Sequence, residues 1–130
     1  MKNRKNVLFI SYFFGKSYGV GAQRVLYWAN NIAKISGGSI TCDVLACKIS
    51  SDEIYPEINN IFCVENDLTS ILDALIQDKG YNWKKSIKQF LISQKENLSY
   101  ETILISGGPF MHFSLVPFLK KLFDCQVILD

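Results

Sequence analysis

Five short apolar runs, separated by segments long enough to form helices, constrain the fold of this chain most strongly. Each run is rich in β-forming side chains and too short for a core helix, which is typical of strands covered on both faces of a parallel sheet. We place these strands at residues 6–11, 40–47, 60–64, 102–106 and 126–129.

Three of the four segments between the runs repeat apolar side chains at helical spacing, whereas residues 50–59 are polar, contain Pro56 and are expected to form a loop. Gly37 and Gly38 end the first of these helices, Gly80 separates the second from the third, and Pro117 falls in the first turn of the last. The predicted helices cover residues 22–35, 67–79, 82–97 and 114–123. Strands that alternate with helices predict one α/β domain over residues 1–130, a Rossmann-like parallel sheet with helices on both faces.

The loop at residues 12–24 is the main functional clue, because glycines at Gly15, Gly19 and Gly21 lie between the first strand and the first helix. Glycine accepts positive φ angles and close approach of a ligand, and a helix that begins directly behind such a loop presents unpaired N–H groups. Ligands of parallel sheets bind at the carboxyl ends of the strands. We therefore expect this loop and residues 106–114 to line one cleft.

Two phosphate-binding motifs fail in this loop. The dinucleotide fingerprint needs a third glycine, but residues 19–23 are followed by Arg24, and no acidic residue ends the second strand. Residues 15–17 read Gly-Lys-Ser, like the end of a P-loop. That motif also requires a glycine five residues before its Gly-Lys-Ser, and here that position is Ile10. We therefore expect no nicotinamide cofactor, and no other cofactor is indicated.

Two blocks of sequence resemble the N-terminal domain of retaining glycosyltransferases of the GT-B fold, the group 1 or family 4-like enzymes. The first block is the strand at residues 7–10 with the loop and helix start at 19–26, and the second is the strand and proline loop at 103–110. The helix at 119–123 and the strand at 127–130 continue the second block in the order that this family has. The chain would then be one half of a GT-B fold.

The resemblance implies a function for this half. In the family, the N-terminal domain binds a sugar or glycolipid acceptor, and a C-terminal domain, absent from this chain, binds the nucleotide-sugar donor. The sugar is transferred with retention and without an essential metal, often in polysaccharide synthesis, and this fragment alone is not expected to be active. Asp130 matches the start of a segment whose catalytic residues lie further on, so the catalytic residues of this chain stay unknown. The alternative is a non-enzymatic Rossmann-like module that binds a ligand or a partner.

Six residues are candidates for acceptor binding, and each also has a structural interpretation. The glycines permit either tight turns or close approach of a ligand. The arginine is either an anion-binding group or a salt-bridge partner, and the histidine is either a hydroxyl-binding group or part of the core. These candidates are Gly19, Gly21, Arg24, Gly107, Gly108 and His112.

The charge of the chain indicates few partners. A net charge of +2, without long runs of like charge, argues against nucleic acid. In the helix at 82–97, Trp83 lies beside Lys84, Lys85 and Lys88. This pattern is found in helices that touch a membrane surface and, more often, in helices that cover a sheet. Peripheral membrane contact through these four residues is therefore a second hypothesis.

The cysteines Cys42, Cys47, Cys63 and Cys125 include no C-x-x-C pair, and their apolar surroundings predict buried, reduced thiols. A zinc site built from them and His112 would need distant segments, so no metal is expected. A basic start precedes the first apolar run, but no signal-peptide cleavage site follows, and no run approaches the ~20 residues that span a bilayer. We expect a cytoplasmic protein, with the inner membrane as the site of any peripheral contact.

Overall fold

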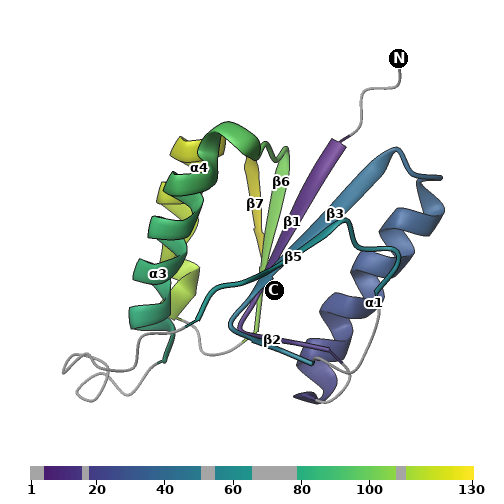
Figure 1. The fold of residues 1–130 in the computed structure, drawn as a ribbon, viewed down its shortest axis with the longest axis horizontal. Coiled ribbons are helices and arrows are strands. Elements are labelled where there is room, and N and C mark those ends of the chain that lie inside the picture. The colour runs from purple at the N-terminus through teal and green to yellow at the C-terminus, as the bar shows by residue number, and fades with distance from the viewer. Residues whose placement is uncertain (1–4, 16–17, 51–54, 66–78, 108–110) are drawn as a thin grey trace.

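The five predicted strands form one parallel sheet in the computed structural model, which describes residues 5–15, 18–50, 55–65, 79–107 and 111–130. The order across the sheet is β5-β3-β1-β6-β7 (Figure 1), and all four neighbouring pairs are parallel. The strands are β1 (Lys5–Ser11), β3 (Ile40–Ala46), β5 (Asn60–Cys63), β6 (Thr102–Ser106) and β7 (Gln126–Leu129). Their bounds agree with the predicted strands to within one residue.

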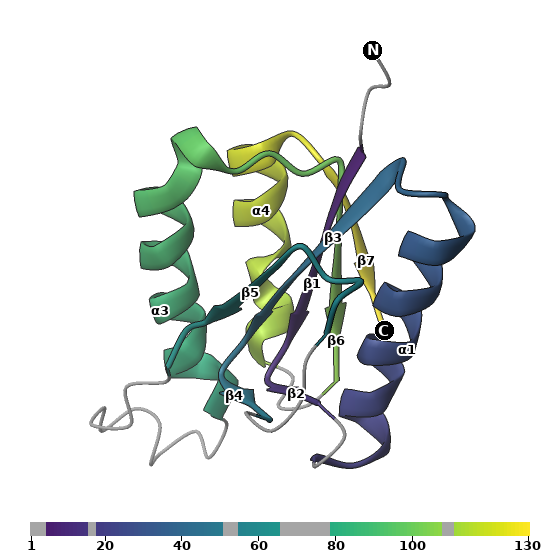
Figure 2. The same cartoon turned by 45° about the vertical axis from the view of Figure 1, so that its right-hand side comes forward.

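Helices cover both faces of this sheet, as predicted. The helix α1 (Val20–Ile35) lies on one side, and α3 (Lys79–Gln94) and α4 (Val116–Phe123) lie side by side on the other (Figures 1 and 2). The Rossmann-like α/β arrangement is therefore confirmed.

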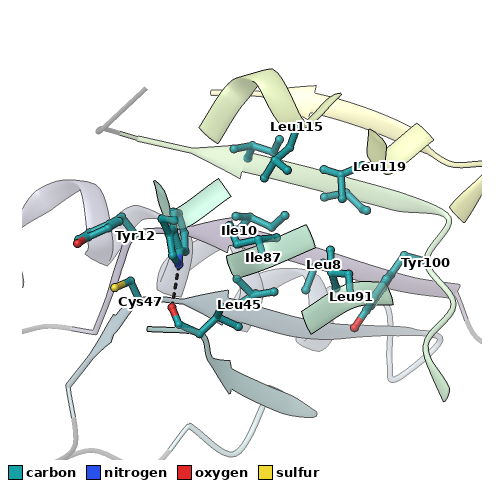
Figure 3. Close-up of a cluster of buried hydrophobic side chains, with 14 residues drawn as sticks. Leu8, Ile10, Tyr12, Leu45, Cys47, Ile87, Leu91, Tyr100, Leu115 and Leu119 are labelled. Atoms are coloured by element: carbon teal, nitrogen blue, oxygen red, sulfur yellow. Dashed lines mark hydrogen bonds between the residues drawn. The ribbon is translucent and has the colours of Figure 1, made fainter. Parts of the chain in front are cut away.

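Successive side chains along each strand point to opposite faces of the sheet, so they pack into two separate cores. Leu8 and Ile10 of β1 pack with α3 and α4, whereas Phe9 between them packs with α1, and all three are fully buried. Figure 3 shows the core on the α3 and α4 side, where side chains from these helices cover β1 and β3. Because each fully buried aliphatic or aromatic side chain contributes roughly 1.5–3 kcal/mol, the sheet is stabilised from both faces.

The helix ends show where local sequence signals were sufficient. Gly37 and Gly38 follow α1 with φ of 62° and 86°, and their N–H groups donate to the carbonyls of Lys34 and Ala33, so the predicted C-cap is confirmed. Pro117 lies in the first turn of α4, as predicted.

Other helix bounds differ from the prediction. Gly80 was expected to separate two helices, but α3 begins at Lys79 and includes it, because a glycine in the first turn costs only about 1 kcal/mol relative to alanine. The last helix begins later than predicted, after a 3-10 turn, η3 (Met111–Leu115), and α3 runs into a second 3-10 turn, η2 (Lys95–Asn97). The predicted helix at 67–79 lies, apart from Lys79, outside the described residues.

A two-stranded parallel sheet that was not predicted fixes the start of the glycine loop. Its strands are β2 (Phe13–Phe14) and β4 (Lys48–Ile49), which follow β1 and β3 after a bend. The carbonyl of Tyr12 accepts the N–H groups of Cys47 and Lys48 at 3.1 and 2.9 Å. Residues 12–14 are therefore tied to the end of β3 rather than free in a loop.

Candidate functional site

The order of the strands reverses at β1, which lies between β3 on one side and β6 on the other. Ser11 at the end of β1 is directly opposite Ser106 at the end of β6, so the chain leaves both strands at the same edge of the sheet (Figure 2). This edge is the usual ligand position in open parallel sheets. The predicted juxtaposition of the two loop starts is thus present in the structure.

Three glycines of the first loop have different structural roles. Gly15 has a φ of 116°, and a Cβ placed on it would lie 2.4 Å from Cβ of Ser50 and 2.8 Å from the hydroxyl of Tyr55, so only glycine fits there. Gly19 precedes α1 with a φ of 92° and has open space where a Cβ would be. Gly21 lies in the first turn of α1. Gly15 was not among the predicted site residues, and its steric role depends on Ser50, which lies 35 residues later in the chain.

Arg24 of α1 forms an ion pair with Asp130, which directly follows β7. Nη1 of Arg24 lies 2.9 Å from Oδ2 of Asp130, and the hydroxyl of Ser106 donates to the same oxygen at 3.2 Å. The backbone of Asp130 continues the ladder between β6 and β7, since its N–H donates to Ile105 and its carbonyl accepts from Gly107. The salt-bridge interpretation of Arg24 is therefore observed, and the binding interpretation stays a prediction.

The ion pair between Arg24 and Asp130 is partly open to water, because the two side chains are 49% and 26% exposed. Pairs of this exposure contribute about 0.2–1 kcal/mol to stability. The guanidinium also lies 5.8 Å from the ring centroid of Trp28, a cation–π contact. The pair orients Arg24 at the sheet edge without holding it strongly.

His112 lies beneath the same edge rather than on it. Its ring is fully buried, its Nε2 is 3.4 Å from the carbonyl oxygen of Ser106, and its edge contacts reach Trp83 and Phe113 at 5.1 and 5.2 Å between centroids. Of the two interpretations of His112 that the sequence allowed, binding and packing, the structure shows the packing role.

The glycines of the second loop are described only in part. Gly107 has a φ of 75° at the end of β6, and Gly108 lies outside the described residues.

Trp83 has the core role that was the alternative to membrane contact. Its side chain is fully buried, and its indole N–H donates to the carbonyl of Val64 at 2.8 Å. Trp83 therefore offers no surface to a membrane, which corrects that part of the hypothesis. Lys85 is exposed, Lys84 and Lys88 are partly exposed, and contact through these lysines stays a prediction.

The four cysteines are free thiols, but they are not all buried. Cys42 and Cys47 are buried as predicted, whereas Cys63 is exposed because it ends the edge strand β5, and Cys125 is partly exposed. Burial, with a smaller contribution from the charge of Asp43, raises the pKa of Cys42 to about 11. In the part of the chain that the structure describes, no three His, Cys, Asp or Glu side chains are grouped as a metal site would require.

The described helices include none with the length and apolar character needed to cross a bilayer.

Comparison with protein-family models and with curated proteins gives no match to this chain. Its fold is similar to the C-terminal domain of a hydrogenase from Pyrococcus furiosus, with a TM-score of 0.61 over 100% of this chain and 92% of that one. The two sequences are 13% identical, so the likeness shows a shared α/β fold and carries nothing about activity. Fold and site geometry together define the class of this protein. It is a Rossmann-like α/β domain with a polar cluster at the point where the strand order reverses.

Proposed function

We propose that this chain is the acceptor-binding domain of a GT-B glycosyltransferase that acts in polysaccharide synthesis. The observation that carries the proposal is the convergence of Arg24, Ser106 and Asp130 beside the glycine loop, at the point where the strand order reverses. The sequence resemblance of the two loop regions supports the same assignment. The nucleotide-sugar donor would be held by the other domain of that fold.

The chemistry of the cluster suits a sugar. Vicinal hydroxyls each donate and accept hydrogen bonds. Here the guanidinium of Arg24 and the hydroxyl of Ser106 both lie within hydrogen-bond distance of the carboxylate of Asp130. An arginine also binds the phosphate of a phosphosugar or of a lipid-linked acceptor through paired N–H groups. A sugar hydroxyl or phosphate is therefore the ligand group that we assign to this edge.

The start of α1 adds backbone donors to the same edge. Gly19 is the N-cap and has no side chain to accept from the first N–H groups of the helix, and the helical ladder starts with the bond from Gln23 to Gly19. These N–H groups and the positive end of the helix dipole favour an electronegative ligand atom. Arg24 lies one turn further along the same helix, so both kinds of donor come from one rigid element.

Aromatic side chains near the loop supply an apolar surface for a sugar ring. Tyr18 is 40% exposed, and its ring centroid lies 5.3 Å from that of Phe13. Trp28 lies below the guanidinium of Arg24. Because the ion pair of Arg24 is weak, a ligand would replace it at a cost of about 1 kcal/mol or less.

The test is a titration of the isotopically labelled chain, followed by amide NMR shifts, with glucose, N-acetylglucosamine and their 1-phosphates as probes. We expect shifts confined to residues 18–24, Ser106, Gly107 and Asp130, and loss of these shifts in Arg24→Ala. The matched control is Lys34→Ala, which removes an exposed cation from the far end of the same helix. Shifts elsewhere, or shifts unchanged in Arg24→Ala, would contradict the proposal.

The proposal extends to location and to activity. The enzyme would be cytoplasmic, where it would bind its nucleotide-sugar donor, and it would bind a lipid-linked acceptor at the inner membrane. The chain by itself should bind sugar without transferring it, so incubation with a nucleotide sugar and an acceptor should give no product. Tight binding of a ligand that is not a sugar would favour the alternative of a non-enzymatic binding module.

A further inference from the structure

A groove with an apolar floor and a basic rim runs between α3 and α4, which lie side by side on one face of the sheet (Figures 1 and 2). Its volume is about 240 Å³, and its lining residues are Ile92, Lys95, Phe118, Lys121 and Leu122. Ile92 is 59% exposed, which is unusual for an isoleucine with an apolar hollow beside it. Phe118 and Leu122 are partly buried against the core below, so the floor is fixed.

Positive charge is concentrated on the helices that form this groove, and Lys95 and Lys121 line the groove itself. From Trp83 onward, α3, η2 and α4 contain six lysines and a single acidic residue, Glu96, although the whole chain carries a net charge of only +2. The remainder of the chain is therefore net negative. The charge is segregated onto the α3 and α4 face rather than spread over the surface.

Helix dipoles explain only part of this charge. Lys120 and Lys121 lie in the last turn of α4, and Lys95 directly follows α3, positions where cations stabilise the negative ends of the helices. Lys84 and Lys85 lie in the first half of α3, where the dipole gives a cation no benefit. Charge on this face thus exceeds what the helices themselves require.

We propose that the groove docks an acidic amphipathic segment of a partner protein. One apolar side chain of the partner would fill the hollow between Ile92, Phe118 and Leu122, and carboxylates beside it would pair with Lys95 and Lys121 on the two walls. The hollow is smaller than the roughly 300–1,000 Å³ of small-molecule sites, and its size suits one or two side chains. A concave hollow between helices also fits an inserted side chain better than the flat surface of a bilayer.

A further contact extends the same surface along α3. The ammonium of Lys88 lies 5.5 Å from the ring centroid of Phe118, so a third lysine borders the apolar floor. This surface is on the opposite face of the sheet from α1 and Arg24. Docking there leaves the proposed sugar site open, and the two proposals can fail independently.

The probe for this proposal is a synthetic helical peptide with leucine at positions i, i+3, i+4 and i+7 and glutamate elsewhere, labelled for fluorescence anisotropy with the full chain. We expect binding that weakens as salt is raised and that is absent for the counterpart with lysine in place of glutamate. The double variant Lys95→Glu with Lys121→Glu should lose at least about tenfold in affinity, a change of about 1.4 kcal/mol. Ile92→Ser, at an exposed position, should weaken binding without unfolding the chain.

The control variant is Lys34→Glu with Lys48→Glu, which makes the same change in net charge at exposed positions outside α3 and α4. An equal loss of binding in this control, or no binding of the acidic peptide by the native chain, would overturn the proposal. Cosedimentation with anionic phosphatidylglycerol vesicles, in the absence of peptide binding, would replace it with a membrane-docking role.

Discussion

The hydroxyl of Tyr100 donates a hydrogen bond of 2.7 Å to Oδ2 of Asp43, and both side chains are buried. The other carboxylate oxygen accepts the N–H of Asn60 at 3.0 Å. One carboxylate therefore joins β3, the start of β5 and the segment that precedes β6. Because both oxygens have donors, an aspartate is tolerated in the buried part of a largely apolar strand.

We expect Tyr100→Phe to destabilise the protein by about 1–3 kcal/mol, since it leaves a buried carboxylate oxygen without its donor. The measurement is the free energy of unfolding from urea denaturation. Tyr27→Phe is the matched control, because Tyr27 is 65% exposed and its change should stay within about 0.5 kcal/mol. Equal effects of the two substitutions would show that the buried hydrogen bond contributes nothing.

The same pair predicts a loss of stability at high pH. Burial, then the hydrogen bond to Asp43 and its negative charge, raises the pKa of Tyr100 above its ordinary value. Above pH ~10 the unfolded chain releases this proton while the folded chain keeps it, so the free energy of unfolding falls as pH rises. Cys42, with a pKa of about 11, acts with the same sign above its ordinary value of 9.0.

Urea denaturation at a series of pH values checks this expectation. Tyr100→Phe should flatten the decline above pH ~10, and since Cys42 is present in both proteins, the difference isolates Tyr100. A decline of the same steepness in Tyr100→Phe would mean that other groups cause it.

Thiol labelling should divide the cysteines by position. Cys63 is exposed and should react in the folded protein, whereas Cys42 and Cys47 should react only on unfolding. Burial, followed by the charge of Glu65, raises the pKa of Cys63, so its reaction at neutral pH should be slower than that of a free thiol. Iodoacetamide labelling read by mass spectrometry gives the order, with Cys63→Ser as control. Early labelling of Cys42 would contradict the packing of β3.

The sequence was sufficient for the five strands of the main sheet because their periodicity and length are local properties. Ile40 to Cys47 alternates between faces in the sequence, and in the structure Leu45 and Cys47 enter one core while Val44 and Ala46 enter the other. The end of α1 could also be predicted from local sequence, since two consecutive glycines supply the left-handed cap. Elements of this kind need no knowledge of distant contacts.

The site could be predicted only in outline. Its position at the sheet edge follows from the βα order, but the partner of Arg24 lies 106 residues away, and no spacing rule links it to Asp130. The burial of Trp83 against Val64 likewise depends on how α3 packs on the sheet. Lysines beside an aromatic residue look the same in the sequence whether the ring points inward or outward.

Gly15 and Gly19 lead to the last prediction, because both have positive φ and only one is crowded. Gly15→Ala adds a clash with Ser50 at 2.4 Å to the backbone strain, whereas Gly19→Ala meets nothing within 4 Å. Strain of this kind costs roughly 1–3 kcal/mol at either position, so thermal and urea unfolding should show a larger loss for Gly15→Ala. Gly38→Ala, also at positive φ in open space, is the control for strain outside the glycine loop. A greater loss for Gly19→Ala than for Gly15→Ala would mean that β2 and β4 do not hold the loop against Ser50.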